Sequence, residues 1–508
     1  MARKNRRRDK LVRGAAQKTS KKAGTAARRK RSASRWLGVA AAGLVVAAAL
    51  VLAMTGVFDR ATPSSPGAPS DPASEAGAPP RPNVLLVTLD TTRADHLGCY
   101  GYPKPISENL DRLAAGATVF DRAIVQAAVT PVSHASLFTG LNPYSHGLRV
   151  MHGLSENRLA DSHLTLAEVL REAGYATAGF VSAFPVTERF GLHQGFDTFD
   201  ADFLRDPPER LVAEDGSANT DRNQRRADAT SDRALSWLRG APEPFFLWLH
   251  YFDPHDPLMT PPPAFVESFG PLGGSEHEML RALYDAEIAY MDRHLGRVLD
   301  ALERRGALEE MVVVVIADHG EGLGDHDWWT HGILYQEQIR VPLIIRAPGR
   351  PAGRRVDALV RSIDVMPTVL ELLGWPDAAL PPTEGQSLVP LLDGAADPQR
   401  LAYADSVNVL TYTVRPTIVD KQDDMLFALM RGPWKYIHHR KHTERSELYH
   451  LDRDRREQHN LYAAHPEVVR DLLNELRARR VLPGQRSGRE PTSAEDRERL
   501  KALGYVDE

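Results

Sequence analysis

Residues 311–326 read MVVVVIADHGEGLGDH, an apolar run that ends abruptly in Asp318 and His319 and continues into a glycine-rich turn. An unbroken apolar run of this length is typical of a strand that is buried on both faces of a parallel sheet. In open α/β sheets, ligands bind just beyond the carboxyl ends of the strands. An aspartate and a histidine at that position can both reach one metal ion, so this stretch predicts a metal site at the sheet edge.

Residues 83–90 repeat the pattern, because NVLLVTL is followed directly by Asp90. Further apolar runs predict strands at 176–182, 244–250 and 341–346. Helical patterns lie between them, one from a Ser162 cap to residue 173 and one over 278–305 with apolar residues three and four apart. Strands that alternate with helices predict an α/β fold with a mainly parallel central sheet, and we assign it to residues 82–375.

The pattern of predicted strands and helices changes after residue 375. Residues 434–439 and 447–452 read as strands, 466–479 as a helix and 493–505 as a charged helix. Residues 376–508 are therefore expected to form a smaller α+β subdomain that packs on the first.

The N-terminal region predicts a membrane anchor. Residues 1–35 hold 15 Lys or Arg and a single acid, and residues 36–58 carry no charge over a length that suits one transmembrane helix. The preceding basic tail places the N-terminus in the cytoplasm and the catalytic domain outside. Residues 59–81, rich in Pro, Ala, Ser and Gly, read as a linker. A cleaved signal peptide is the alternative, but the basic region is long for one.

The remaining chain carries 48 basic against 66 acidic residues, a net charge of −18. Such a surface argues against a nucleic-acid partner. Cys99 is the only cysteine, so an exported chain would hold no internal disulfide.

Thr130 is the candidate nucleophile. Residues 126–140, QAAVTPVSHASLFTG, read as a strand-to-helix turn with Pro131 at the first helical position. A hydroxyl at a helix start meets unpaired backbone N–H groups, which favour anions. Thr130 could therefore attack an ester with help from a metal, or it could simply cap the helix.

The candidate metal ligands are Asp90, Asp318 and His319. Two carboxylates and an imidazole suit Zn²⁺ or Mn²⁺ better than Ca²⁺, which prefers oxygen ligands alone. Further histidines follow the predicted strands and could hold an oxyanion or protonate a leaving group. They are His250, His255, His326 and His331.

Several motifs together resemble the sulfatase family of the alkaline phosphatase superfamily. They are DTTRADHLGCYG (90–101), SHASLFTG (133–140), DHGEGLG (318–324), RVPLII (340–345), DVMPT (364–368) and LKALGY (500–505). The resemblance covers residues 82–508 in the family's order. It implies an alkaline-phosphatase-like α/β sandwich with a smaller C-terminal subdomain, and one divalent metal on Asp90, Asp318 and His319 with the nucleophile Thr130 at the same ion.

The resemblance also implies roles around the substrate. His250 and His331 are assigned to catalysis, and His331 falls where many sulfatases carry a lysine. Arg93, His134, His255 and His326 are assigned to binding the anion.

One departure from the family concerns the nucleophile. Sulfatases place a Cys or Ser there, followed by a Pro or Ala and an Arg at fixed spacing, and convert the first residue to formylglycine. Here Thr130, Val132 and His134 fill these slots. Oxidation of threonine would give a ketone and not an aldehyde, so no formylglycine is expected. Thr91 also stands where the family's calcium site has its second aspartate. This loss counts against Ca²⁺, which is kept as the alternative to Zn²⁺ or Mn²⁺.

A threonine nucleophile beside an Asp–His pair is similar to the phosphoethanolamine transferases and lipoteichoic acid synthases of the same superfamily. We therefore expect a membrane-anchored, metal-dependent hydrolase or transferase of a phospho- or sulfo-ester, with an envelope glycan or lipid head group as candidate substrates. A sulfatase that works without formylglycine and an inactive, glycan-binding relative are the alternatives.

Overall fold

The computed structural model describes residues 81–149, 158–203, 224–255, 260–269, 274–376, 380–396, 400–406 and 424–479. All of them belong to one compact unit, Pro79–Glu508. The predicted basic tail, transmembrane segment, most of the linker and the helix at 493–505 lie outside the described residues. Among the helices within these ranges, none combines the length and apolar character that a bilayer crossing requires.

The core is an eight-stranded sheet in the order β4-β3-β5-β1-β6-β7-β2-β8. Only β7 runs against its neighbours β6 and β2; the other pairings are parallel, so the mainly parallel sheet expected from the sequence is confirmed. The strands are β1 (Val84–Leu89), β2 (Thr118–Ile124), β3 (Ala176–Phe180), β4 (Thr198–Asp200), β5 (Phe245–Tyr251), β6 (Val312–Ala317), β7 (Arg340–Arg346) and β8 (Arg354–Arg361).

The three central strands, β5, β1 and β6, are buried at every residue. Each valine or leucine that is fully buried contributes roughly 1.5–3 kcal/mol, which is why these runs carry no polar alternation. The register aligns Thr88 with His250 on one side of β1 and Leu89 with Ala317 on the other. This register brings the next residues of β1 and β6 side by side.

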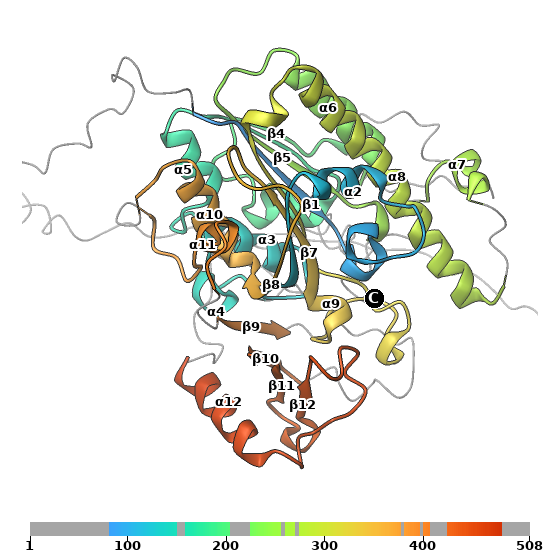
Figure 1. Ribbon diagram of the computed structural model, residues 1–508, viewed down its shortest axis with the longest axis vertical. Helices are drawn as coiled ribbons and strands as arrows, with labels where there is room; N and C mark the ends of the chain where they lie inside the picture. The colour runs from blue at the N-terminus through green and yellow to red at the C-terminus, as the bar shows by residue number, and fades with distance from the viewer. Residues whose placement is uncertain are drawn as a thin grey trace, which may run out of the picture. The chain divides into compact units, whose positions relative to one another are not determined.

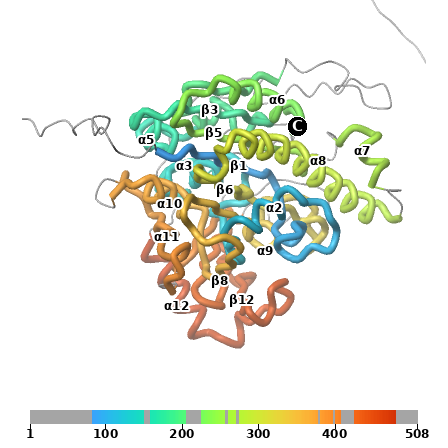
Figure 2. Tube along the Cα trace, turned by 45° about the horizontal axis from the view of Figure 1, so that its top comes forward, coloured from blue at the N-terminus to red at the C-terminus, as the bar shows by residue number. Residues whose placement is uncertain are grey.

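Helices cover both faces of the sheet (Figure 1). On one face, α2 (Glu108–Ala115) and α6 (Ala227–Leu238) pack on the long helix α8 (Glu276–Arg304). On the other lie α3 (Thr130–Thr139), α5 (Leu166–Glu172) and α10 (Val365–Leu372). The tube in Figure 2 shows the strands between these two layers. Shorter helices are α4 (Pro143–His146), α7 (Pro263–Ser268), α9 (Gln336–Ile339) and α11 (Val389–Leu392).

The start of α5 differs from expectation. Thr165, not Ser162, precedes the helix and accepts a hydrogen bond from the N–H of Glu168, whose carboxylate accepts in return from Thr165. This reciprocal capping box satisfies two donors, whereas Ser162 would satisfy at most one.

A second, four-stranded antiparallel sheet follows in the order β12-β11-β10-β9. Its strands are β9 (Leu401–Ser406), β10 (Leu426–Arg431), β11 (Trp434–His439) and β12 (Glu447–His450), and α12 (Pro466–Ala478) follows them. One face packs a separate apolar cluster with α12, including Leu472 and Leu476, while Ala404, Ala428 and Ile437 join the main core. The subdomain boundary near residue 376 stays a prediction.

Candidate active site

Asp90 and Asp318 leave adjacent strands at the same level, since each follows the last residue of an aligned pair. Strands lie about 4.8 Å apart, so the two carboxylates must share a site. His319 completes the group: one ligand atom of each residue lies within 4.8 Å of the others, and all three side chains are buried. The structure thus brings together the three predicted metal ligands.

The hydrogen bonds of these carboxylates are incomplete. Asp318 Oδ1 accepts from the N–H groups of Thr91 (3.2 Å) and His319 (2.8 Å). The remaining oxygens, Asp90 Oδ1 and Asp318 Oδ2, are buried and lack a hydrogen bond of ordinary geometry, and the Thr130 hydroxyl beside both carboxyl groups offsets only part of the rise in their pKa. Burial raises the pKa of both carboxyl groups well above their ordinary value, and the charge of Asp90 adds to the rise at Asp318. Two buried acids with bare oxygens fit a divalent cation, which would compensate their charge.

His319 is set up as a ligand by its other ring nitrogen. Its Nδ1 lies 3.0 Å from the carbonyl of Gly320, which can only accept, so Nδ1 carries the proton. Burial and the neighbouring His331 hold the pKa of His319 well below its usual value, so the ring is neutral. The lone pair of Nε2 therefore faces the site, where Thr130 Oγ1 lies 3.1 Å away.

Thr130 is the first residue of α3 and is fully buried. The sequence had placed the start one residue later, at Pro131. Thr130 Oγ1 thus lies at the positive end of a ten-residue helix and beside His319. A hydroxyl in this position can attack an anion that the helix terminus holds.

Thr91 has a backbone angle φ of +49°, in the left-handed region that β-branched residues avoid. In this conformation its N–H points to Asp318, and its carbonyl accepts a 2.8 Å hydrogen bond from the Tyr284 hydroxyl. Strain of this kind persists only where surrounding contacts impose it, and it is common at functional sites.

His250 lies behind Asp90. Its Nδ1 accepts from the N–H of Ser182 (3.3 Å), so Nε2 carries the proton and donates to Asp90 Oδ2 (3.1 Å). Burial lowers the pKa of His250 to about 3, which keeps the ring neutral. With both nitrogens engaged, His250 orients Asp90, and this geometry does not support the leaving-group role expected for it.

His134 is similarly engaged. Its Nδ1 donates to the carbonyl of Thr130 (2.8 Å), and its Nε2 lies 3.1 Å from the hydroxyl of Thr88. Trp248 Nε1 donates to the same hydroxyl at 2.9 Å, so the Thr88 proton goes to His134. These contacts fix the first turn of α3 against β1 and leave His134 no nitrogen for a substrate.

His255 and His331 form a pair, with their Nε2 atoms 3.1 Å apart. His331 Nδ1 donates to the carbonyl of Ala128 (3.0 Å), so His331 Nε2 accepts and His255 Nε2 donates. The ring of His331 lies 4.3 Å from that of His319, centroid to centroid. Burial lowers the pKa of His331 to about 4. The pair therefore holds a proton close to the metal-ligand group.

Arg93 and His326 have protein partners in place of an anion. The guanidinium of Arg93 bonds both oxygens of Asp95 and lies 2.9 Å from Asp325 Oδ2. His326 stacks on Tyr335 with centroids 3.8 Å apart, and its Nδ1 lies 2.8 Å from Glu337. The structure does not bring these two residues into the group around Thr130.

Sequence reasoning missed Glu321 and Ser182. Burial, followed by the charge of Asp90, raises the pKa of Glu321 well above its ordinary value. Its place in the DHGEG motif was a signal that could have found it. Ser182 follows β3 and holds His250 through its N–H and through its hydroxyl, which donates to the His250 carbonyl. No signal in the sequence marked it.

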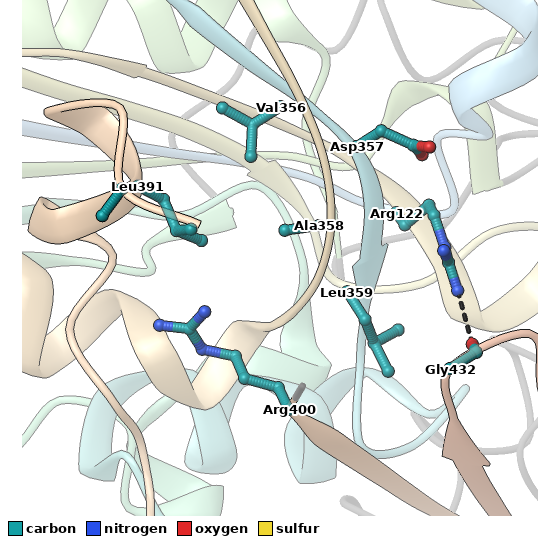
Figure 3. Close-up of a pocket in the computed structure, with 9 residues that line it drawn as sticks. Arg122, Val356, Asp357, Ala358, Leu359, Leu391, Arg400 and Gly432 are labelled. Atoms are coloured by element: carbon teal, nitrogen blue, oxygen red, sulfur yellow. Dashed lines mark hydrogen bonds between the residues drawn. The ribbon is translucent and has the colours of Figure 1, made fainter. Parts of the chain in front are cut away.

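A separate cavity of about 320 Å³ lies at β8, the sheet edge three strands from β6 (Figure 3). Arg122 and Arg400 border it, and Arg122 donates to the carbonyl of Gly432 at 2.7 Å. It shares no residue with the group around Thr130.

Known proteins match the chain over most of its length. The family model described as Sulfatase matches residues 82–375, and the model N-sulphoglucosamine sulphohydrolase, C-terminal, matches 324–481. An arylsulfatase of Clostridium perfringens is 26% identical over 498 residues, covering 84% of this chain and 98% of its own. A multifunctional alkaline phosphatase superfamily protein of Trinickia caryophylli is 28% identical over 455 residues, covering 70% and 87%.

The fold has solved counterparts. The crystal structure of the phosphonate monoester hydrolase of Agrobacterium radiobacter superposes with a TM-score of 0.62 at 24% identity, covering 79% of this chain and 96% of that one. The α/β architecture is therefore that of a known enzyme fold.

The shared burial of Asp90 and Asp318 predicts an unusual pH dependence of stability. In metal-free protein at a pH above ~4, the Asp90–Asp318 pair holds a proton in the folded state that it has lost in the unfolded chain. The free energy of unfolding therefore falls as pH rises through the raised pKa values. Asp90→Asn should raise that free energy by about 1–2 kcal/mol at pH 8 and by nothing at pH 4, as measured by urea unfolding after chelation.

Asp200→Asn is the control of opposite sign. Burial opposes ionisation of Asp200, but Arg225, Arg233 and the N–H of Asp202 together outweigh it and lower the pKa. Its loss should destabilise the protein at pH 8 and less so as pH falls. An Asp90→Asn variant that is destabilised at pH 8 would contradict the account.

Proposed function

Since the chain belongs to the sulfatase family of the alkaline phosphatase superfamily, we propose that it is a metal-dependent hydrolase or transferase in which Thr130 attacks the phosphorus of a phosphate ester. The observation that carries this proposal is the position of Thr130 Oγ1. It lies at the start of α3 and 3.1 Å from His319 Nε2, in the group with Asp90 and Asp318.

Asp90, Asp318 and His319 are the residues that would hold the metal. A divalent cation there would lower the pKa of a nearby hydroxyl and stabilise the charge of the ester. Zn²⁺ or Mn²⁺ fits the mixed oxygen and nitrogen set better than Ca²⁺. Ser182 and His250 keep Asp90 in position, and Gly320 keeps His319 in the ligating tautomer.

The residues account for a two-step reaction. In the first step, the Thr130 hydroxyl gives its proton to the neutral His255–His331 pair as the Thr130 O–P bond forms, and the bond from phosphorus to the leaving oxygen breaks. The pair then returns one proton, from His255 Nε2, to that oxygen, so both imidazoles end the step neutral. In the second step, water or an acceptor alcohol attacks phosphorus and gives its proton to the same pair, the Thr130 O–P bond breaks, and the pair returns that proton to the threonine oxygen.

Threonine favours phosphorus over sulfur as the reaction centre. A formylglycine hydrate carries two hydroxyl groups on one carbon, so it can expel bound sulfate by breaking its own C–O bond. Thr130 has a single hydroxyl and no such route. To free Thr130, water or an acceptor must attack the phosphorus or sulfur atom itself. For phosphorus, this is the ordinary course of phosphoryl transfer through an enzyme-bound ester.

A sulfate ester is the second candidate, and the relatives favour it. They include the arylsulfatase of C. perfringens and an N-acetylglucosamine-6-O-sulfatase of Bacteroides thetaiotaomicron. An inactive relative that binds a sulfated or phosphorylated glycan is a third reading. The retained metal set speaks against it, since a binding relative has little reason to keep both Asp318 and His319 beside Asp90.

We also propose that residues 36–58 anchor the enzyme in a membrane with the catalytic domain outside, because the basic tail precedes the apolar segment. The substrate would then be an envelope glycan or a lipid head group. Protease added to intact cells should digest the catalytic domain and spare the tail, and full protection of the domain would contradict this orientation.

Thr130→Ala should abolish turnover, with kcat reduced by roughly 10³-fold or more, because the attacking oxygen is removed. Its metal content, measured by mass spectrometry, should stay near that of wild type. Thr139→Ala is the matched control, since Thr139 is buried in the same helix and bonds only the carbonyl of Ala135 and the N–H of Leu141. Unchanged turnover in Thr130→Ala would exclude it as the nucleophile.

A panel of model esters separates the candidates. We expect metal-loaded enzyme to cleave aryl phosphates, phosphate diesters or both with higher kcat/KM than aryl sulfates, and chelation to remove the activity. A preference for aryl sulfate would favour the second candidate. Bound metal without turnover on any ester would favour the inactive relative.

A further inference from the structure

The second sheet contacts the loop that carries His331. This loop, residues 325–336, follows β6 and Asp318 and ends at the start of α9. It contains two non-glycine residues in the left-handed region, His326 (φ +51°) and Asp327 (φ +57°). This conformation is unfavourable for both residues, so contacts from outside the loop must stabilise it.

Three contacts come from the second sheet and the turn that follows it. Ser406, the last residue of β9, donates its hydroxyl to the carbonyl of Gly332, directly after His331. Glu447 in β12 accepts from the Tyr335 hydroxyl at 3.0 Å. Glu457 accepts from the N–H of Gln336 at 2.6 Å. The loop is thus held at its centre and at its C-terminal end.

The same turn also holds the N-terminal end of the loop. His326 Nε2 lies 3.3 Å from the carbonyl of Glu457, which can only accept. The side chain of Glu457 is itself fixed by Lys435 in β11, 2.6 Å away, and both side chains are fully buried. Tyr335 connects the two ends, because its ring stacks on His326 and its hydroxyl reaches Glu447.

We propose that the second sheet positions His331 for catalysis, with Ser406, Glu447 and Glu457 as positioning residues that hold the loop 325–336. These residues act on the loop and through it on His331, so their part in the reaction is indirect. The inference rests on the proposed function, in which His331 accepts the hydrogen bond of His255 Nε2, the group that returns a proton to the leaving oxygen. The ring of His331 also lies 4.3 Å from that of His319. The C-terminal subdomain is then part of the catalytic machinery and not a separate binding module.

Ser406→Ala tests the proposal at one hydrogen bond. Ser446→Ala is the matched control, because Ser446 is equally buried, lies beside the same sheet and bonds the N–H of His439 and the Tyr436 side chain, both within the subdomain. Both variants remove one hydroxyl and should lower the melting temperature to a similar extent. In Ser406→Ala alone, we expect kcat to fall roughly 10-fold with KM unchanged, since small displacements of a catalytic group are costly.

Amide hydrogen exchange of the loop supplies a readout that does not depend on activity. Exchange in residues 332–336 should be several-fold faster in full-length Ser406→Ala and unchanged in Ser446→Ala. Equal exchange in the two variants would overturn the proposal, and so would faster exchange with unchanged kcat. If wild type turns over no ester while exchange responds as expected, the holding of the loop is supported and the proposed function fails instead.

Glu457→Gln provides a second variant in case Ser406→Ala does not fold. It keeps an acceptor for Gln336 but removes the charge beside Lys435, so the loop should exchange faster and kcat should fall. Asp364→Asn is its control, because Asp364 is equally buried and pairs with Arg361 and the N–H of Gln386, which lie outside the loop. Loss of kcat in the control to the same extent would contradict the proposal.

Discussion

The structure depends on the placement of two negative charges, Asp90 and Asp318, at the ends of neighbouring buried strands. The register of β1 and β6 leaves no choice in this, because the pairs aligned along both strands end one residue before each aspartate. A buried carboxylate without a partner is unstable, and two within one site repel each other. The surrounding groups orient the two carboxylates and leave room for a cation that would offset their charge.

Three of the surrounding imidazoles have their protons fixed by backbone groups that can only donate or only accept. The carbonyls of Gly320 and Ala128 take the Nδ1 protons of His319 and His331, whereas the N–H of Ser182 forces the His250 proton onto Nε2. One neutral ring thereby offers a lone pair, and another offers a proton. This sorting of similar side chains by backbone partners is what allows a histidine-rich site to contain a ligand, an orienting residue and a proton donor.

Sequence reasoning was strong where one physical signal dominated. The apolar runs of β1, β5 and β6 predicted buried strands, and the polar residues at their ends predicted the group of Asp90, Asp318 and His319. It failed to identify β2, β4, β8, β9 and β10. The runs of β2 and β8 mix apolar and charged residues, and β4 has only three residues. Sequence reasoning also could not tell which histidines face the site, because that depends on tautomers set by backbone groups distant in sequence.

The assignment of Arg93 shows the same limit. A basic residue three positions after Asp90 reads as an anion-binding residue, yet Asp95 and Asp325 neutralise it. Asp95 lies only two residues away, but the pair with Asp325 is decided by the return path of the chain, which spacing in sequence does not reveal. The role of the second sheet was invisible for the same reason, since its contacts to the loop 325–336 join residues roughly 75 to 130 positions apart.

Anomalous diffraction from crystals grown with Mn²⁺ or Zn²⁺ would test the central claim most directly. The account predicts one anomalous peak per chain, within coordination distance of Asp90, Asp318 and His319 and adjacent to Thr130 Oγ1. Crystals that show no peak among these residues at saturating metal, or a peak that Asp90 and Asp318 do not contact, would contradict it.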